Sequence, residues 1–517
     1  MKDTAFLTQK ESLRLKIQAS LDAAKTQEER NRMGQFATPS SLASEVLRHA
    51  KKMLPRSQKI RFLDPALGSG SFYSALLREF PASRILAGVG YEIDPHYGSP
   101  ASRLWSEMGL DVRMGDFTKA DPCGDTFNLM ICNPPYVRHH HILTGEKARI
   151  QESSYRACGI QFSGLAGLYC HFLGIAHAWL AEGGLAGWLI PSEFMDVNYG
   201  EAVKRYLLDR VRLLHIHRFD PHDVQFGDAL VSSTVVWFRK ETPPIEYDVE
   251  FSFGGTLRKP TISRQISSTD LRAEAKWTRF PLSETRIKDN APKLSDYFSI
   301  RRGLATGDND FFILSEAQIK SRALPVQFFR PILPSPRYLP ASEILSDDDG
   351  NPLLDDPLFL LDCRLPENVV KRDFQRLWDY FQEGVKKGVA DRYLCQHRSP
   401  WYSQENRPAA PFVCTYLGRS NTKSGKPFRF ILNRSRATIT NVYLALYPKE
   451  PLAKTVETCP KTGRHVWEIL NKICPQTMLA EGRVYGGGLH KLEPKELANV
   501  PVPELAEIFG RRWLAAI

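Results

Sequence analysis

Between Ile60 and about Lys240, short apolar runs alternate with stretches of helical periodicity, and this alternation limits the possible folds more than any other feature. It predicts a mostly parallel sheet with helices on both faces, which is a doubly wound α/β fold. The strand candidates are residues 60–65, 85–92, 111–114, 128–135, 185–191, 213–219 and 233–239. No long helical stretch separates the last two, which predicts an antiparallel hairpin that closes the sheet.

The regular alternation of apolar runs and helical stretches ends after residue 245. Residues 246–517 are richer in proline, aromatic residues and loops, and they predict a second domain of mixed α+β architecture. They carry 40 Lys and Arg against 32 Asp and Glu, a net charge of +8, whereas residues 1–245 carry +3. Within 391–440 the count is 9 against 2. Such an excess indicates a polyanion as partner, with a merely solvated basic surface as the alternative.

Cysteine usage and hydropathy predict a protein of the reducing cytoplasm. The nine cysteines include no C-x-x-C pair, which argues against a zinc site and against a disulfide framework. The N-terminus is polar and helix-like rather than a signal peptide. The most apolar window, 168–191, is interrupted by His171, His177 and a Glu-Gly-Gly turn, so it predicts a buried helix, a turn and a strand. We therefore expect neither a membrane span nor a bound metal.

A polar side chain stands at the end of each of four successive strand candidates. These residues are Asp64, Glu92, Asp116 and Asn133. Because the ends of neighbouring parallel strands line one crevice, we expect them to surround one ligand. Asp64 precedes a Gly-Ser-Gly loop at 68–70, where glycines let the backbone approach a ligand and a helix N-terminus offers free N–H groups. A carboxylate before such a loop repels a pyrophosphate and suits a cationic ligand.

The order of these residues suits a nucleoside with a positively charged tail. Glu92 is placed to grip ribose hydroxyls. Asp116 can accept a hydrogen bond from an exocyclic amine, and Phe117 can lie against a purine. Taken singly, Asp116 has the alternative of a helix N-cap, Phe117 that of a core aromatic, and the glycine loop that of a tight strand–helix connection.

Residues 133–136, Asn-Pro-Pro-Tyr, end the apolar run 129–132. The two prolines fix φ twice and remove two backbone donors, so the turn is stiff and cannot continue a strand. Asn133 and Tyr136 stand at its two edges. At the end of a central strand, this arrangement can hold a second flat group that has hydrogen-bonding edges.

Together these motifs resemble the S-adenosylmethionine-dependent amino-methyltransferases that modify DNA, specifically their gamma class. The resemblance covers residues 30–240 and rests on GQFATP (34–39), DPALGSGSF (64–72), YEID (91–94), GDF (115–117), NPPY (133–136), GLYCHF (167–172) and DVQFGDALVSSTVVWFRK (223–240). RRGLATGDNDFF (301–312) resembles the opening of the target-recognition domain in that class. The resemblance implies a seven-stranded class I methyltransferase sheet in residues 1–245, a target-recognition domain in 246–517, and S-adenosyl-L-methionine as the cofactor.

The resemblance also implies the site residues. The implied catalytic residues are Asn133, Pro134, Pro135, Tyr136 and Phe226, the last packing on the substrate base. The implied cofactor-binding residues are Gln35, Ala37, Thr38, Pro39, Asp64, Pro65, Ala66, Gly68, Ser69, Gly70, Glu92, Ile93, Asp116, Phe117, Asn133, Pro135 and Phe172. It implies no metal ligand.

The function implied is methylation of adenine N6 in double-stranded DNA, as the modification enzyme of a restriction–modification or related defence system. Its partner would be a separate cognate restriction endonuclease. The Asn133 side-chain oxygen and the Pro134 carbonyl would accept from the adenine amine, and the base must leave the duplex to be reached. Two alternatives stay open: an NPPY methyltransferase that acts on RNA or on a protein glutamine, and a catalytically silent DNA-specificity protein.

Two further stretches have weaker interpretations. The three histidines at 139–141 are expected to be solvated or near phosphate rather than to bind a metal. In the basic stretch 391–440, Arg398, Arg419 and Arg434 are candidates for DNA contact.

Overall fold

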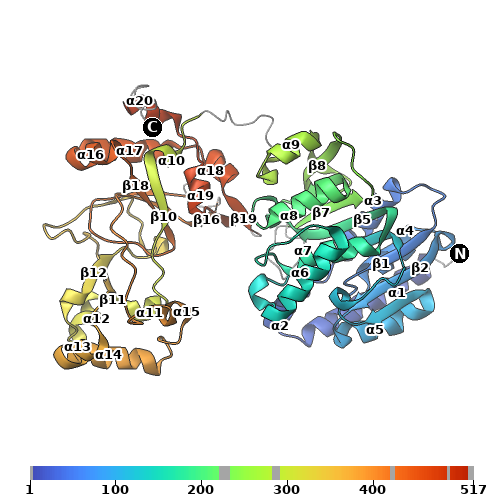
Figure 1. The fold of residues 1–517 in the computed structure, drawn as a ribbon, viewed down its shortest axis with the longest axis horizontal. Coiled ribbons are helices and arrows are strands. Elements are labelled where there is room, and N and C mark those ends of the chain that lie inside the picture. The colour runs from blue at the N-terminus through green and yellow to red at the C-terminus, as the bar shows by residue number, and fades with distance from the viewer. Residues whose placement is uncertain (1–3, 221–232, 282–290, 420–425, 486–488, 510–517) are drawn as a thin grey trace. The chain divides into compact units, whose positions relative to one another are not determined.

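The computed structural model describes residues 4–220, 233–281, 291–419, 426–485 and 489–509. The chain forms two compact units (Figure 1). The first comprises Met1–Thr285 with Tyr485–Gly487, and the second comprises Arg286–Val484 with Gly488–Ile517.

One large sheet forms the centre of the first unit. Its strands are β1 Ile60–Asp64, β2 Ile85–Glu92, β3 Leu110–Met114, β4 Phe127–Cys132, β5 Leu180–Pro191, β6 Arg212–Arg218, β7 Ser233–Arg239, β8 Asp248–Gly255 and β9 Pro260–Ser267. They lie in the order β3-β2-β1-β4-β5-β7-β6-β8-β9. The strands from β3 to β5 are parallel, and β7 runs antiparallel to both β5 and β6, as predicted for the last pair.

Helices cover both faces of this sheet. They are α1 Thr4–Ala23, α2 Gln27–Met33, α3 Ser40–Met53, α4 Ser71–Glu79, α5 Pro95–Trp105, α6 Thr144–Cys158, α7 Leu168–Ala176, α8 Gly200–Arg205 and α9 Ser268–Ala273. Successive side chains of a strand point to opposite faces. In β4, Leu129 and Ile131 accordingly join an apolar cluster with α3, α4 and α5, whereas Met130 and Cys132 join one with α6, α7 and α8. The doubly wound arrangement follows from this burial of both faces.

The sheet has nine strands, so the predicted number of seven is too small. β8 pairs in parallel with β6, and β9 pairs antiparallel with β8. Val249 and Phe251 of β8 are buried in the first unit, and that unit extends to Thr285 rather than to residue 245. The prolines at 243–244 resemble a linker but mark only the entry into β8. The alternation of Val249, Phe251 and Phe253 is the strand signal that the prediction missed.

The second unit is less regular, as its sequence predicts. Its strands are β10 Phe298–Arg302, β11 Ile313–Ser315, β12 Phe329–Ile332, β13 Glu343–Ile344, β14 Leu358–Leu361, β15 Phe412–Thr415, β16 Leu417–Arg419, β17 Phe430–Asn433, β18 Tyr443–Pro448, β19 Arg483–Tyr485 and β20 Leu489–Lys491. They form a five-stranded sheet, β10-β18-β15-β17-β13, and two three-stranded sheets, β11-β14-β12 and β16-β20-β19.

Short helices and three separate apolar clusters complete this second unit. The helices are α10 Leu294–Tyr297, α11 Asn309–Phe312, α12 Glu316–Ser321, α13 Glu367–Asp373, α14 Gln375–Lys386, α15 Tyr393–Gln396, α16 Leu452–Thr458, α17 Pro460–Lys472, α18 Pro475–Glu481, α19 Pro494–Ala498 and α20 Pro503–Phe509. In the described parts of both units, no helix combines the length and the apolar character that crossing a membrane requires.

Candidate active site

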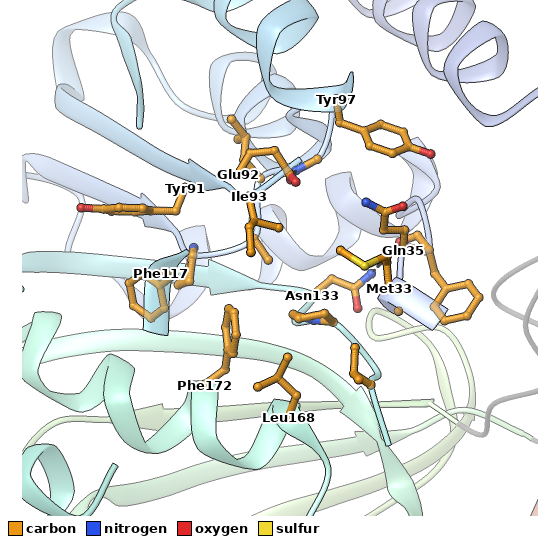
Figure 2. A pocket seen from close by; sticks show the side chains of 18 of the residues that line it. Met33, Gln35, Tyr91, Glu92, Ile93, Tyr97, Phe117, Asn133, Leu168 and Phe172 are labelled. Carbon is orange, nitrogen blue, oxygen red and sulfur yellow. Dashed lines mark hydrogen bonds between the residues drawn. The ribbon is translucent and has the colours of Figure 1, made fainter. Parts of the chain in front are cut away.

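A cavity of about 480 Å³ lies in the first unit at the carboxyl ends of β1 to β4. Phe117 and Phe172 lie toward one end, and Gln35, Met33 and Asn133 lie toward the other (Figure 2). Most of the predicted cofactor-binding residues line it. They are Gln35, Ala37, Thr38, Asp64, Pro65, Ala66, Gly68, Ser69, Glu92, Ile93, Asp116, Phe117, Asn133, Pro135 and Phe172. The topology thus gathers residues from four strand ends, as parallel sheets of this kind do.

Asp64 ends β1 and is 1% exposed. Its Oδ1 atom accepts the N–H of Ala66 at 3.1 Å. Burial raises the pKa of Asp64 to about 8, and the nearby Glu92 carboxylate adds to the increase. Without a ligand the group therefore holds a proton near neutral pH. A cation in the cavity would favour its ionised form.

Glu92, at the end of β2, connects two loops. Its Oε2 atom accepts from the N–H of Gly68 at 2.9 Å, and its Oε1 atom accepts from the N–H of Asp94 at 2.8 Å. Burial raises the pKa of Glu92. Asp94 in turn accepts from the Gln35 side chain at 2.8 Å and pairs with Lys25. These carboxylates hold the loops after β1 and β2 and the segment around Gln35 in one network.

Asp116 both caps a turn and lines the cavity. Its Oδ1 atom accepts from the N–H and the hydroxyl of Thr118, at 2.9 and 2.7 Å, and Arg149 lies 3.7 Å from its Oδ2 atom. Phe117 is 2% exposed, and its ring centroid lies 5.5 Å from that of Phe172. Asp116 is therefore an N-cap and Phe117 is a core aromatic, and both residues also line the cavity.

The two polar atoms of the Asn133 side chain differ in their hydrogen bonding: Nδ2 has partners and Oδ1 has none among the described residues. Its Nδ2 atom donates to the carbonyl oxygen of Phe36 at 3.0 Å and to the hydroxyl of Thr38 at 3.1 Å. Its Oδ1 atom is buried and accepts no hydrogen bond from any residue that the structure describes. A buried acceptor without a partner costs free energy unless a ligand satisfies it. This atom is therefore the strongest indication of a bound donor.

The turn 133–136 and the segment 34–39 are in backbone contact. Gly34 has a φ of +66°, and a Cβ atom added there would lie 2.4 Å from the nitrogen of Tyr136 and 2.9 Å from the carbonyl carbon of Pro135. The Tyr136 hydroxyl donates to the carbonyl oxygen of Leu189 at 3.0 Å. The centroid of the Tyr136 ring lies 5.9 Å from that of the Phe36 ring. The orientation of the Tyr136 ring is thus fixed from both ends.

Some predicted site residues lie elsewhere. Pro39 does not line the cavity but precedes α3 as its N-cap. Gly70 does not line it either: it lies against Trp105, where an added Cβ would lie 2.5 Å from the indole nitrogen. Pro134 is buried beside the cavity, and Tyr136 is half-buried outside its lining. Phe226 lies outside the described residues.

The sequence prediction missed one side of the cavity. The additional lining residues come from α1, from the end of α2, from α5, from α6 and from the start of α7; they include Gln18, Asp22, Met33, Tyr97, Leu143, Glu146, Ile150 and Leu168. Apart from Leu168, which lies in the GLYCHF motif (167–172), none carries a local signal in the sequence. Their place depends on how the helices dock on the sheet.

His141 of the histidine turn lines the cavity, and two of the three candidate arginines of the basic stretch, Arg398 and Arg434, make contacts within the second unit. His139–His141 form a 3-10 turn, and among the described residues no group of three or more His, Cys, Asp or Glu side chains is arranged to hold a metal ion. In the second unit Arg398 donates to the carbonyl oxygens of Ala305 and Thr306, both at 2.6 Å. Arg434 pairs with Glu343 at 2.8 Å.

The strand order and the cavity together define the class of protein. A mixed α/β sheet in the order β3-β2-β1-β4-β5-β7-β6-β8-β9, with a cavity at the carboxyl ends of its parallel strands, fits the fold of a class I methyltransferase. β8 and β9 are additions at one edge.

Comparison with known proteins places the chain within this class. Residues 113–225 match the family model of the Eco57I restriction-modification methylase, and residues 274–516 match that of the C-terminal domain of the Type II methyltransferase M.Eco57I. The chain is a methyltransferase of the restriction–modification type.

Individual relatives agree with this assignment. The chain is 28% identical to the Type II methyltransferase M.XamI of Xanthomonas campestris pv. amaranthicola, over 92% of this chain and 86% of that protein. It is 25% identical to the Type II methyltransferase M.AccI of Acinetobacter calcoaceticus, over 91% of this chain and 85% of that protein. The Type IIL restriction-modification enzyme MmeI, solved in complex with DNA, shares the fold with a TM-score of 0.51 at 13% identity; the match covers 89% of this chain and 64% of that longer one.

Proposed function

We propose that this chain transfers a methyl group from S-adenosyl-L-methionine to N6 of an adenine in double-stranded DNA, as the modification enzyme of a restriction–modification system. The proposal depends mainly on one observation: the Oδ1 atom of Asn133, at the edge of the cavity, is buried and has no hydrogen-bond partner among the described residues. The names of the relatives and the net charge of +8 on residues 246–517 support DNA as the substrate.

The residues of the cavity fit S-adenosylmethionine. Phe117 and Phe172 offer apolar faces to the adenine, and Glu92 lies where ribose hydroxyls would be bound. Asp64, whose charge is suppressed by burial, offers a counter-charge to the cationic methionine part. When bound, this cofactor supplies an electrophilic methyl group on a positively charged sulfur.

Asn133 and Pro134 would prepare the substrate amine. The lone pair of that amine is shared with the adenine ring, so the amine is a weak nucleophile. Hydrogen bonds from the amine to Asn133 Oδ1 and to the Pro134 carbonyl would favour a tetrahedral nitrogen and free the lone pair. The two Nδ2 hydrogen bonds hold Asn133 in this orientation beforehand. The surplus amine proton leaves to water, so the acceleration comes from positioning and electrostatics.

A parallel assay separates the candidate substrates. Labelled S-adenosylmethionine is incubated with the full chain and with duplex DNA, RNA or protein, and transfer to adenine N6 of DNA is expected. Transfer only to RNA or to a protein glutamine would overturn the proposal. DNA binding with no transfer would identify a catalytically silent specificity protein.

Affinity for the cofactor is expected to increase with pH up to about 8. The pKa of Asp64 is raised to about 8 by burial. Below that pH a cationic ligand must displace the proton, so the affinity gains up to about tenfold per pH unit and is constant above pH 8. Calorimetric titration between pH 6 and 9 measures this dependence. Asp64→Asn should flatten it, and an unchanged slope in that variant would assign the proton to another group.

Tyr136→Phe is expected to keep substantial activity, whereas Tyr136→Ala loses most of it. The ring would stack on the extrahelical base, and such stacking is worth about 1–3 kcal/mol. The hydroxyl donates to the Leu189 carbonyl oxygen, so the phenylalanine variant loses this contact but keeps the ring. Steady-state methylation kinetics of the two variants test this, and equal losses would show that the hydroxyl bond is the essential feature.

A further inference from the structure

Helix α1 packs on the first unit through a buried ion pair and two partly buried apolar residues, Leu7 and Ile17. Its buried residues are Glu11 and Arg14, which are 6% and 1% exposed, whereas its Leu13 and Leu15 are 45% and 46% exposed. The Arg14 guanidinium donates to both Glu11 oxygens, at 2.8 and 2.7 Å. A buried ion pair stabilises a fold only weakly, because desolvation of the two charges offsets their attraction. The contribution of this ion pair is therefore better sought in the residues that Arg14 contacts beyond Glu11.

Arg14 also donates to the loop that follows β1 and to the first residue of α3. Its Nη1 atom donates to the hydroxyl of Ser69 at 2.9 Å, and its Nη2 atom donates to the hydroxyl of Ser40 at 3.1 Å. The carbonyl oxygen of Ser69 accepts from the Trp105 indole at 2.9 Å. Ser69 lines the cavity and is thus fixed through both its side chain and its backbone.

The opposite end of α1 contacts the first turn of α5, the helix that follows β2. The Asp22 carboxylate accepts from the Tyr97 hydroxyl at 2.9 Å, and the Leu21 carbonyl oxygen lies 2.9 Å from the His96 ring nitrogen. Gln18 and Asp22 line the cavity. The helix therefore connects the loop after β1 with the first turn of α5, and both line the cavity.

We infer that Glu11 and Arg14 are positioning residues of the cofactor site. Arg14 holds Ser69, and with it the glycine loop at 66–70, in the conformation that receives the cofactor, and Glu11 holds Arg14. The inference rests on the proposed function, because it takes the cavity as the S-adenosylmethionine site. A guanidinium presents its donors in a fixed planar fork, which a lysine ammonium does not reproduce, so Arg14→Lys keeps the charge but loses the geometry.

Calorimetric titration of the full chain with S-adenosylmethionine tests this inference. Arg14→Lys and Ser69→Ala are each expected to raise the Kd about tenfold, with the maximal methylation rate at saturating cofactor within about twofold of the parent. The double variant should bind S-adenosylmethionine no more weakly than the weaker of the two single variants, because both changes break the same hydrogen bond between Arg14 and Ser69. The control is Arg156→Lys, in an exposed pair with Glu152 on α6, which should leave the Kd unchanged.

The outcomes distinguish this inference from the proposed function. If the parent chain binds no S-adenosylmethionine, the proposed function fails, and the inference fails with it. If the parent binds and the variants bind equally well, the inference alone is overturned, even where their melting temperatures fall. Additive losses would show that Arg14 does not act through Ser69 and would also overturn it. Ser69→Ala leaves the ion pair in place, so it decides the matter if Arg14→Lys does not fold.

Discussion

Replacing Asn133 with alanine is expected to lower the rate of methyl transfer by about a thousandfold, while the affinity for S-adenosylmethionine stays within a few fold of the parent. The Oδ1 atom of Asn133 has no described partner, so its loss removes an acceptor for the substrate amine without breaking a described hydrogen bond. The variant also removes the two Nδ2 hydrogen bonds to the segment 34–39. Rapid-quench methylation and calorimetric titration with the cofactor measure the two quantities separately.

The control for this prediction is the other end of the same side chain. Asn133 Nδ2 donates to the Phe36 carbonyl oxygen and to the Thr38 hydroxyl. Thr38→Val removes one of these two acceptors and leaves Oδ1 in place, so its loss of maximal rate should be much smaller than that of Asn133→Ala. Because Thr38 lines the cavity, the rates are compared at saturating cofactor.

A different result would change the role of Asn133. If cofactor affinity fell as much as the rate in Asn133→Ala, the residue would act mainly by holding the segment 34–39 through Nδ2. If Thr38→Val and Asn133→Ala were equally impaired, orientation of the side chain rather than acceptance of a hydrogen bond would be its contribution.

The central strands could be predicted because they are buried on both faces. In β4, alternate residues enter two different cores, so the sequence shows a continuous apolar run. In β8, Asp248 and Gly255 at the ends are exposed while Val249 and Phe251 are buried. A short alternating pattern after two prolines is a weaker signal, and the predicted domain boundary was placed before it.

The strand-end residues of the site were predictable because topology alone brings them together. Asp64, Glu92 and Asn133 need only lie at the ends of adjacent parallel strands to share one cavity. Gln18 and Asp22 belong to a helix whose docking depends on Arg14 and on Ser69, 55 residues further along the chain. Neither periodicity nor a local motif records such a pairing.

The basic stretch 391–440 shows the limit of charge counting. Arg398 and Arg434 bind a backbone carbonyl and a carboxylate, and Arg429 donates to the Pro340 carbonyl oxygen at 2.7 Å. An arginine that satisfies a loop contributes to net charge in the same way as one that contacts phosphate. Arg398→Ala is therefore a poor test of DNA contact, because it removes the support of residues 305 and 306 as well as a charge.

Substitution of Gly34 by alanine is expected to reduce the methylation rate on the order of a hundredfold, although Gly34 contributes no side chain to the cavity that it lines. The added Cβ would lie 2.4 Å from the backbone nitrogen of Tyr136, and real Cβ contacts do not fall below 3.0 Å. The turn 133–136 and the segment 34–39 would therefore have to separate by about 0.6 Å. Since the opposing atoms belong to a backbone stiffened by two prolines, no side-chain rotation can relieve the contact.

The backbone strain of the substitution must be distinguished from the collision. Gly34 has a φ of +66°, where alanine costs roughly 1–2 kcal/mol whatever surrounds it. Gly183 provides a matched control, because its φ is +73° and no described atom lies within 4 Å of a Cβ added there. Gly183→Ala should therefore show the loss of stability from strain alone, with the methylation rate unchanged.

Thermal unfolding and methylation rates of both variants complete the comparison. The expected pattern is a lower melting temperature in both variants, with the larger decrease in Gly34→Ala because of the added collision, and a loss of rate in Gly34→Ala alone. Equal rates would mean that the turn moves away without loss of function, so that close contact between the segments 34–39 and 133–136 is not required for transfer. A rate loss confined to Gly34→Ala would instead show that the position of Tyr136 and Asn133 depends on a neighbour with no side chain.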